Sequence, residues 1–208
     1  MNKVKYLLTY RYAEIIHDLT VEFTKAYLMG NLSTLRNLSN LSQKADYRQV
    51  DQMNQAARSG KQNIVEGVGQ SQTSKSGEIK LLGVSEASFE ELLSDFEDFL
   101  RQRGLALWGK DSLKAQAVRR LTYTANKSYM TYKSYIENSD AEIAANTLIC
   151  LVHQENYLLD QLLRSLEKSF MKDGGFTERL YNARSGYKSY KPNRSYRSNT
   201  TLKTNKSY

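Results

Sequence analysis

The sequence is poor in residues that crosslink a chain, break helices or hold metals. It has one cysteine, one proline and two histidines among 208 residues. A lone cysteine cannot form an internal disulfide, which suits a reducing, cytoplasmic location. No apolar run approaches the ~20 residues that span a bilayer, and the first residues lack the apolar run of a signal peptide. We therefore expect a cytoplasmic protein with no membrane partner.

Acidic residues are missing from the C-terminal end. Between residues 182 and 208 there are seven basic residues and no acidic one. The whole chain has 30 basic and 22 acidic residues, which leaves 23 basic and 22 acidic residues in 1–181. The end of the chain also interleaves tyrosine with lysine and arginine and is poor in apolar residues, so we expect it to be disordered in isolation. This asymmetry predicts a near-neutral body with a basic C-terminal segment that binds polyanions.

Apolar residues recur at helical three-and-four spacing in four long segments. These segments cover about 7–27, 47–66, 75–103 and 139–170, and a shorter helix is expected within 111–137. Repeated Asn-Leu-Ser favours a polar connector over 30–46. The fold class predicted is all-α: an antiparallel up-and-down four-helix bundle with an additional shorter helix and a disordered basic C-terminal tail. Residues 1–181 form the bundle and 182–208 form the tail.

Several residue types mark the expected helix ends. Ser74 is a candidate N-cap, and Ser139 with Glu142 has the spacing of a capping box. Gly67 suits a left-handed C-cap. Because Glu66 then lies at a helix C-terminus, where the dipole disfavours a carboxylate, it needs a compensating partner.

The stretch QAARSGKQNIVEG carries two interpretations. In the structural one, Asn63 and Glu66, followed by Gly67, lock the tight turn between two helices. In the functional one, Arg58 and Lys61 belong to a surface that faces a ligand. The sequence leaves both open.

Catalytic patterns are incomplete. Glu14 and His17 have the Glu-x-x-His spacing of a di-metal bundle, but the other histidine, His153, follows Cys150 where a second glutamate is needed. No Ser–His–Asp arrangement is suggested, and the glycine-rich segment after residue 66 follows a helix instead of a strand, the wrong context for a phosphate-binding loop. We expect no metal, no cofactor and no enzymatic activity.

Two longer stretches carry a resemblance. QAARSGKQNIVEG and TSKSGEIKLLGVSEASFEELLSDFEDFL resemble the bacterial four-helix-bundle proteins related to the ribosomal RNA intervening-sequence proteins. This family also includes the accessory variability-determinant proteins of diversity-generating retroelements. AANTLICLVHQENYLLDQLLRSLE and GGFTERLYNAR look like its subgroup with a four-helix-bundle suffix domain. The chain departs from the family at Glu86, where members often have a basic residue.

The resemblance implies a bundle that assembles into a ring-like homopentamer. In the retroelement branch it further implies a basic ring that binds a reverse transcriptase and nucleic acid. For the suffix-domain subgroup it implies no settled activity.

Together these features predict a non-enzymatic, oligomeric protein that binds nucleic acid, RNA in the first instance. Lysine and arginine neutralise phosphates, and tyrosines stack on unpaired bases. The alternative is a protein-interaction scaffold, or an accessory subunit of a reverse transcriptase. The candidate nucleic-acid-binding residues are Arg58, Lys61, Tyr187, Lys188, Tyr190, Lys191, Arg194, Tyr196 and Arg197.

Overall fold

A computed structural model describes residues 7–29, 47–124, 126–137 and 139–189. These residues form helices and connecting turns, and none of them lies in a strand. The helices are α1 (Leu8–Tyr27), α3 (Tyr47–Gln70), α4 (Lys75–Gln102), α5 (Leu113–Leu121), α6 (Tyr129–Glu137), α7 (Ala141–Asp173) and α8 (Phe176–Ser189). The predicted connector, 30–46, lies outside the described residues.

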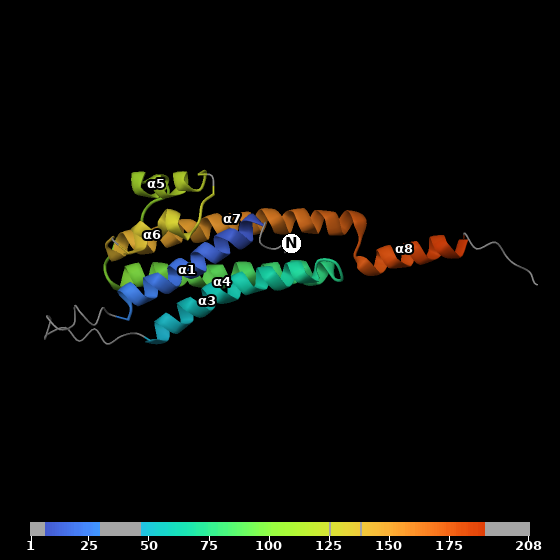
Figure 1. Ribbon diagram of the computed structural model, residues 1–208, viewed down its shortest axis with the longest axis horizontal. Coiled ribbons are helices and arrows are strands. Elements are labelled where there is room, and N and C mark those ends of the chain that lie inside the picture. The colour runs from blue at the N-terminus through green and yellow to red at the C-terminus, as the bar shows by residue number, and fades with distance from the viewer. Residues whose placement is uncertain (1–6, 30–46, 125, 138, 190–208) are drawn as a thin grey trace, which may run out of the picture.

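The four long helices form a closed bundle. α3 packs on α4, α4 on α7, α7 on α1, and α1 on α3. Each neighbouring pair runs antiparallel, as the colours of Figure 1 show. This arrangement confirms the predicted up-and-down four-helix bundle.

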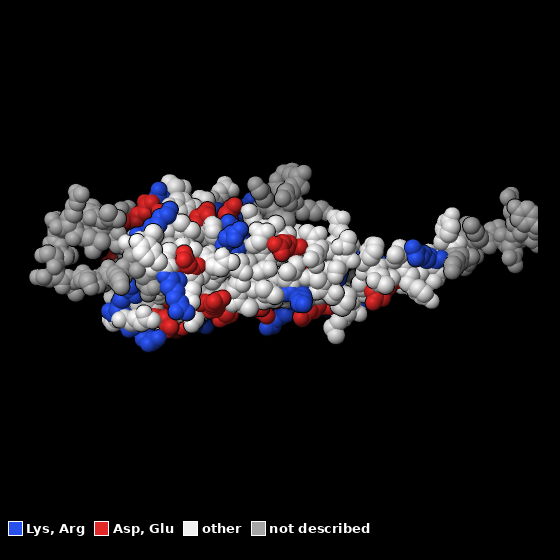
Figure 2. All heavy atoms as spheres, turned by 90° about the horizontal axis from the view of Figure 1, so that it is seen from below, with Lys and Arg blue, Asp and Glu red and all other residues white. Residues whose placement is uncertain are grey.

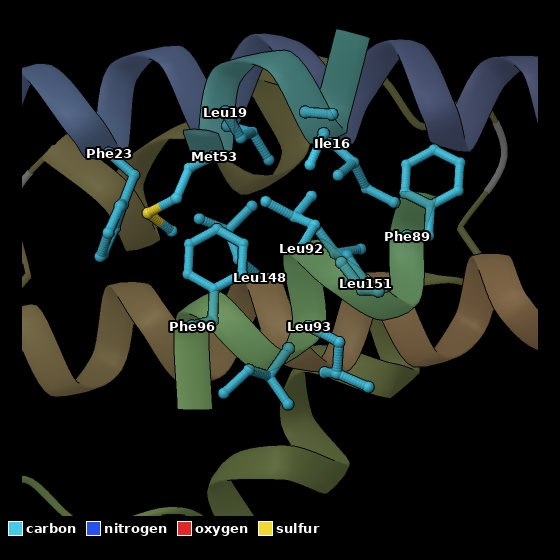
Figure 3. Packing of buried hydrophobic residues seen from close by; sticks show 14 of the residues in the cluster. Ile16, Leu19, Phe23, Met53, Phe89, Leu92, Leu93, Phe96, Leu148 and Leu151 are labelled. Carbon is cyan, nitrogen blue, oxygen red and sulfur yellow. The ribbon is translucent and has the colours of Figure 1, made fainter. Parts of the chain in front are cut away.

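Aromatic and branched side chains fill the space between the helices. The ring of Phe23 lies 5.1 Å from that of Phe96 and 4.8 Å from that of Phe99, both at steep angles. Met53 on α3 and Leu148 on α7 pack in the same cluster (Figure 3). Edge-to-face aromatic packing of this kind adds to the burial of apolar area that stabilises the bundle.

One acidic side chain is enclosed in the bundle. Glu155 on α7 is 0% exposed, and neither of its carboxyl oxygens has a hydrogen-bond partner among the described residues. Burial raises the pKa of this carboxyl well above its usual value. Glu155 is therefore a neutral acid in the folded chain over a wider pH range than an exposed glutamate.

Helices α3 and α4 approach each other closely along glycine and serine. A Cβ on Gly60 would lie 2.7 Å from the ring of Phe89. Ser85 Oγ donates to the Gly60 carbonyl at 2.8 Å. Gly67 also lies inside α3, which continues to Gln70, and a Cβ there would stand 3.3 Å from the Glu78 carbonyl oxygen. The predicted C-cap at Gly67 is therefore wrong, because this glycine serves close helix packing.

The helix expected within 111–137 is two helices. α5 ends at Leu121, where the side chains of Thr122 and Thr124 bond to carbonyls three residues back. Lys127 Nζ then donates to the Thr122 carbonyl at 2.7 Å. These side-chain bonds compete with helical ones and break the segment. α6 packs on α1 and α7, whereas α5 packs on α7.

Two predicted helix caps have different outcomes. Ser74 is the N-cap of α4 as predicted, and its side chain accepts from Gly77 N at 3.0 Å. The predicted capping box of Ser139 and Glu142 is wrong, because Asp140 is the N-cap of α7 and accepts from the Ile143 amide at 2.8 Å. The aspartate carboxylate one residue later therefore satisfies an unpaired amide in the first turn of α7.

The C-terminal boundary also differs from the expectation. α7 ends at Asp173, and Gly174, at φ +66°, begins the turn into α8. α8 runs to Ser189, so residues 182–189 of the segment expected to be disordered are helical. Gly175 N donates to Glu178 Oε2 at 2.9 Å and caps the start of α8. The rest of the predicted tail, 190–208, lies outside the described residues.

Candidate nucleic-acid interface

Helix α8 extends beyond the end of the bundle and carries exposed basic and aromatic residues (Figure 1). Tyr181 is 71% exposed and Tyr187 is 72% exposed. Arg179 and Arg184 are exposed on the same helix. Tyr181 and Arg184 are three residues apart and share one face. Cation and ring therefore stand side by side in solvent, as phosphate and base contacts require.

Few of the predicted tail residues lie in the described part of the chain. Tyr187 is exposed, and Lys188 belongs to α8. The others lie beyond residue 189, outside the described residues: Tyr190, Lys191, Arg194, Tyr196 and Arg197. α8 leads directly into this segment.

The two basic residues proposed on α3 have different surroundings. Arg58 is exposed and makes no hydrogen bond or ion pair within the described ranges. Lys61 is half-buried, and its Nζ lies 3.1 Å from Nδ1 of His17 on α1. That histidine nitrogen also lies 3.0 Å from Asp18 Oδ1. Lys61 therefore contributes to the contact between α1 and α3, and Arg58 alone is presented to solvent.

Asn63 and Glu66 bond within their own helix. Asn63 Nδ2 donates to the Ser59 carbonyl at 2.9 Å. Glu66 is exposed and accepts from Gln62 Nε2 at 3.2 Å. The prediction that this pair locks the turn into α4 is wrong. Because α3 continues past Gly67, Glu66 is not at a helix end, and the turn is closed by Ser74 N donating to the Gln70 carbonyl at 2.8 Å.

Charges over the bundle itself are mixed. Figure 2 shows lysine and arginine interspersed with aspartate and glutamate on the face in view. Some charged side chains of the bundle are paired along one helix, such as Arg101 with Asp98 at 2.7 Å and Arg164 with Asp160 at 2.8 Å. Exposed pairs of this kind leave little unbalanced potential for a polyanion. Helix α8 is therefore a better candidate for binding a polyanion than the face of the bundle shown in Figure 2.

A pocket of about 340 Å³ lies between α7, α5 and the loop before α5. Trp108 and Arg119 line it with Cys150 and His153. Burial raises the pKa of the Cys150 thiol, and the Arg119 charge opposes part of that shift. A raised pKa disfavours the thiolate and hence nucleophilic reactivity at this cysteine.

Glu14 and His17 each contact side chains other than one another. Tyr10 Oη donates to Glu14 Oε1 at 3.3 Å, and His17 faces Lys61 as described above. Within the described ranges, no group of three or more histidine, cysteine, aspartate or glutamate residues could hold a metal ion. In the same part of the chain, no helix is long and apolar enough to cross a membrane.

Arg179, Tyr181 and Arg184 are absent from the residues predicted for the interface. The signal that could have found them is the stripe of Phe176, Leu180 and Ala183 at spacings of four and three, which predicts a helix after the paired glycines. A helix there carries Arg179 and Tyr181 on its exposed sides.

No family model matches the sequence, and neither a curated protein nor a solved structure matches it.

Proposed function

We propose that this protein binds nucleic acid, RNA in the first instance, through α8 and the basic, tyrosine-rich segment that follows it. The observation that carries the proposal is the position of α8. It projects Arg179, Tyr181, Arg184 and Tyr187 into solvent beyond the bundle and leads into a segment with no acidic residue. The bundle serves as a platform and performs no chemistry.

The binding mode follows from these residue types. Arginine and lysine replace counterions on the phosphates, so binding is sequence-tolerant and weakens with salt. Tyrosines stack on unpaired bases, which favours single strands. Because the interface projects from one end of the bundle, an oligomer would gain avidity from several copies.

Deletion of residues 185–208 tests the proposal. The experiment measures anisotropy of a labelled, unstructured single-stranded RNA against protein at several salt concentrations. The deletion removes six basic residues. It should therefore reduce the slope of log affinity against log salt by up to about 4, at ~0.7 for each phosphate contact with a single strand. Full affinity and an unchanged slope in the truncated chain would contradict the proposal, because the six basic residues after residue 184 would then make no phosphate contact.

A matched pair of substitutions tests the stacking component. Tyr187→Ala should weaken binding by about 1–3 kcal/mol, whereas Tyr187→Phe keeps the ring and should bind like the parent chain. Because Tyr187 is 72% exposed, neither change should alter the folding of the bundle. Equal loss in both variants would assign the effect to the hydroxyl and argue against stacking.

A protein-interaction scaffold is the second candidate. It is favoured by apolar residues exposed on and around the two short helices: Leu113 is 80% exposed, Tyr123 is 88% and Met130 is 69%. Such residues fit a protein partner better than a polyanion. The accessory subunit of a reverse transcriptase is one form of this candidate. Co-purification of a reverse transcriptase that is lost on Met130→Glu would support it, and retention of that partner would oppose it.

A further inference from the structure

Helix α1 covers only part of its neighbour α7. Tyr27 Oη lies 2.7 Å from the carbonyl oxygens of both Ile136 and Ser139, within hydrogen-bond distance, which fixes the end of α1 beside the start of α7. α1 has 20 residues and α7 has 33. At ~1.5 Å per residue, α7 therefore runs roughly 20 Å past the start of α1. The extended N-cap at Leu7 shows that α1 begins there.

The surface that α1 covers elsewhere continues beyond its start. On α3, Asn54 accepts from Thr24 and Lys61 meets His17, so these positions mark the stripe that faces α1. Four and seven residues beyond Lys61, the same stripe presents Val65 and Val68. Both valines are half-buried.

Helix α7 continues the same apolar surface. Leu162, Leu166 and Phe170 follow at four-residue spacing and are half-buried. At this end of the bundle α3, α4 and α7 run on together (Figure 1). Among the residues that the structure describes, which begin at residue 7, three helices thus leave an apolar strip at the position that a fourth helix occupies in the rest of the bundle.

Helix α8 has the length and the apolar stripe to cover this strip. Its 14 residues span roughly 21 Å. Phe176, Leu180 and Ala183 recur at spacings of four and three, the pattern of a core-facing helix. Yet Phe176 is 44% exposed and Leu180 is 39% exposed, because α8 points away from its own bundle.

We propose that α8 of a second copy of this chain lies along residues 162–170 of α7 and that the exchange is reciprocal. The ~20 Å of uncovered α7 matches the ~21 Å of α8. α8 roughly prolongs α7 in Figure 1, so two α7–α8 arms can pair antiparallel, each α8 on the partner's α7. A two-residue glycine linker that directs a helix outwards favours exchange between chains.

This inference goes beyond the proposed function, since it concerns assembly and needs no nucleic acid. Tyr181 and Arg184 lie on a different side of α8 from the apolar stripe and stay exposed in the dimer. The dimer therefore places two basic arms on one particle.

Light scattering on the full chain tests the proposal. The parent chain should have twice the chain mass of 23.9 kDa. Leu180→Glu places a charge in the stripe and should halve the measured mass with no loss of helicity by circular dichroism. Asn182→Glu adds the same charge to the same helix away from the stripe and should remain dimeric. A monomeric parent chain, or an oligomer that Leu180→Glu leaves intact, would overturn the proposal.

Disulfide formation between differently tagged chains identifies the occupant of the strip. Both chains carry Cys150→Ser, which removes the native thiol; one adds Leu166→Cys and the other Leu180→Cys. Mixing and mild oxidation should give a crosslinked pair that contains both tags. If a chain carrying both new cysteines crosslinks only internally and the mixed chains do not, α8 folds back on its own bundle and the exchange is refuted.

Discussion

A methyl group added at Gly60 should destabilise the bundle. The new Cβ would lie 2.7 Å from Cε2 and Cζ of Phe89, where carbon contacts normally settle at about 3.5–4.0 Å. The ring would have to move by about 1 Å. Phe89 is 0% exposed, so neighbouring side chains oppose that movement. The Ser85 bond to the Gly60 carbonyl, at 2.8 Å, holds the two helices at this separation.

Two effects of Gly60→Ala oppose each other. Overpacking costs about 1–3 kcal/mol, and replacing glycine by alanine inside a helix returns about 0.5–1 kcal/mol. The net loss should be about 0.5–2 kcal/mol, or roughly 1–8 °C in melting temperature for a chain of this size.

Gly83→Ala is the matched control. Gly83 lies within α4, and a Cβ added there has nothing within 4 Å. The substitution therefore gains helix propensity without a steric clash. It should stabilise the chain by about 0.5–1 kcal/mol. Urea unfolding monitored by circular dichroism measures both variants. A Gly60→Ala chain as stable as the Gly83→Ala chain would refute the close approach of α3 and α4.

Three further outcomes follow from single buried or capping groups. Asn146→Ala should cost about 2–4 kcal/mol and red-shift the fluorescence of the single tryptophan, because Asn146 Oδ1 accepts from Trp108 N at 2.8 Å in a buried site; an unshifted spectrum would exclude this anchor. Asp140→Ala should lower the free energy of unfolding in urea by about 1 kcal/mol, whereas Ser139→Ala should lower it by less. The reverse order would instead identify Ser139 as the N-cap of α7. Glu155 holds its proton in the folded chain above the pH at which an unfolded glutamate releases it, so stability falls as pH rises above about 4.5, by up to about 1.4 kcal/mol per unit. Glu155→Gln should remove that slope above about pH 4.5, and an unchanged slope would place the carboxyl in solvent.

The long helices were predictable because their apolar stripes have one period over many turns. The seam between Phe23 and Phe96 follows from spacing alone. Gly67 misled the prediction because glycine is used both at helix ends and at close helix contacts, and only the presence of α4 decides between them. The sequence alone also could not distinguish the surroundings of Lys61 from those of Arg58. Lys61 contacts His17, which is 44 residues away in sequence.

The interface was only partly accessible to sequence reasoning. Charge asymmetry marks the C-terminal segment, because it depends on composition alone. That Tyr181 and Arg184 stand clear of the bundle depends on the turn at Gly174 and on the start of α8, which composition does not encode.

Ultraviolet crosslinking of the full chain to single-stranded RNA, followed by mass spectrometry of the peptides, tests the central claim most directly. We expect RNA adducts on peptides that contain Tyr181, Tyr187, Tyr190 or Tyr196, and their loss at high salt. Adducts confined to the α3 peptide around Arg58, or no adducts even in dilute buffer, would contradict it.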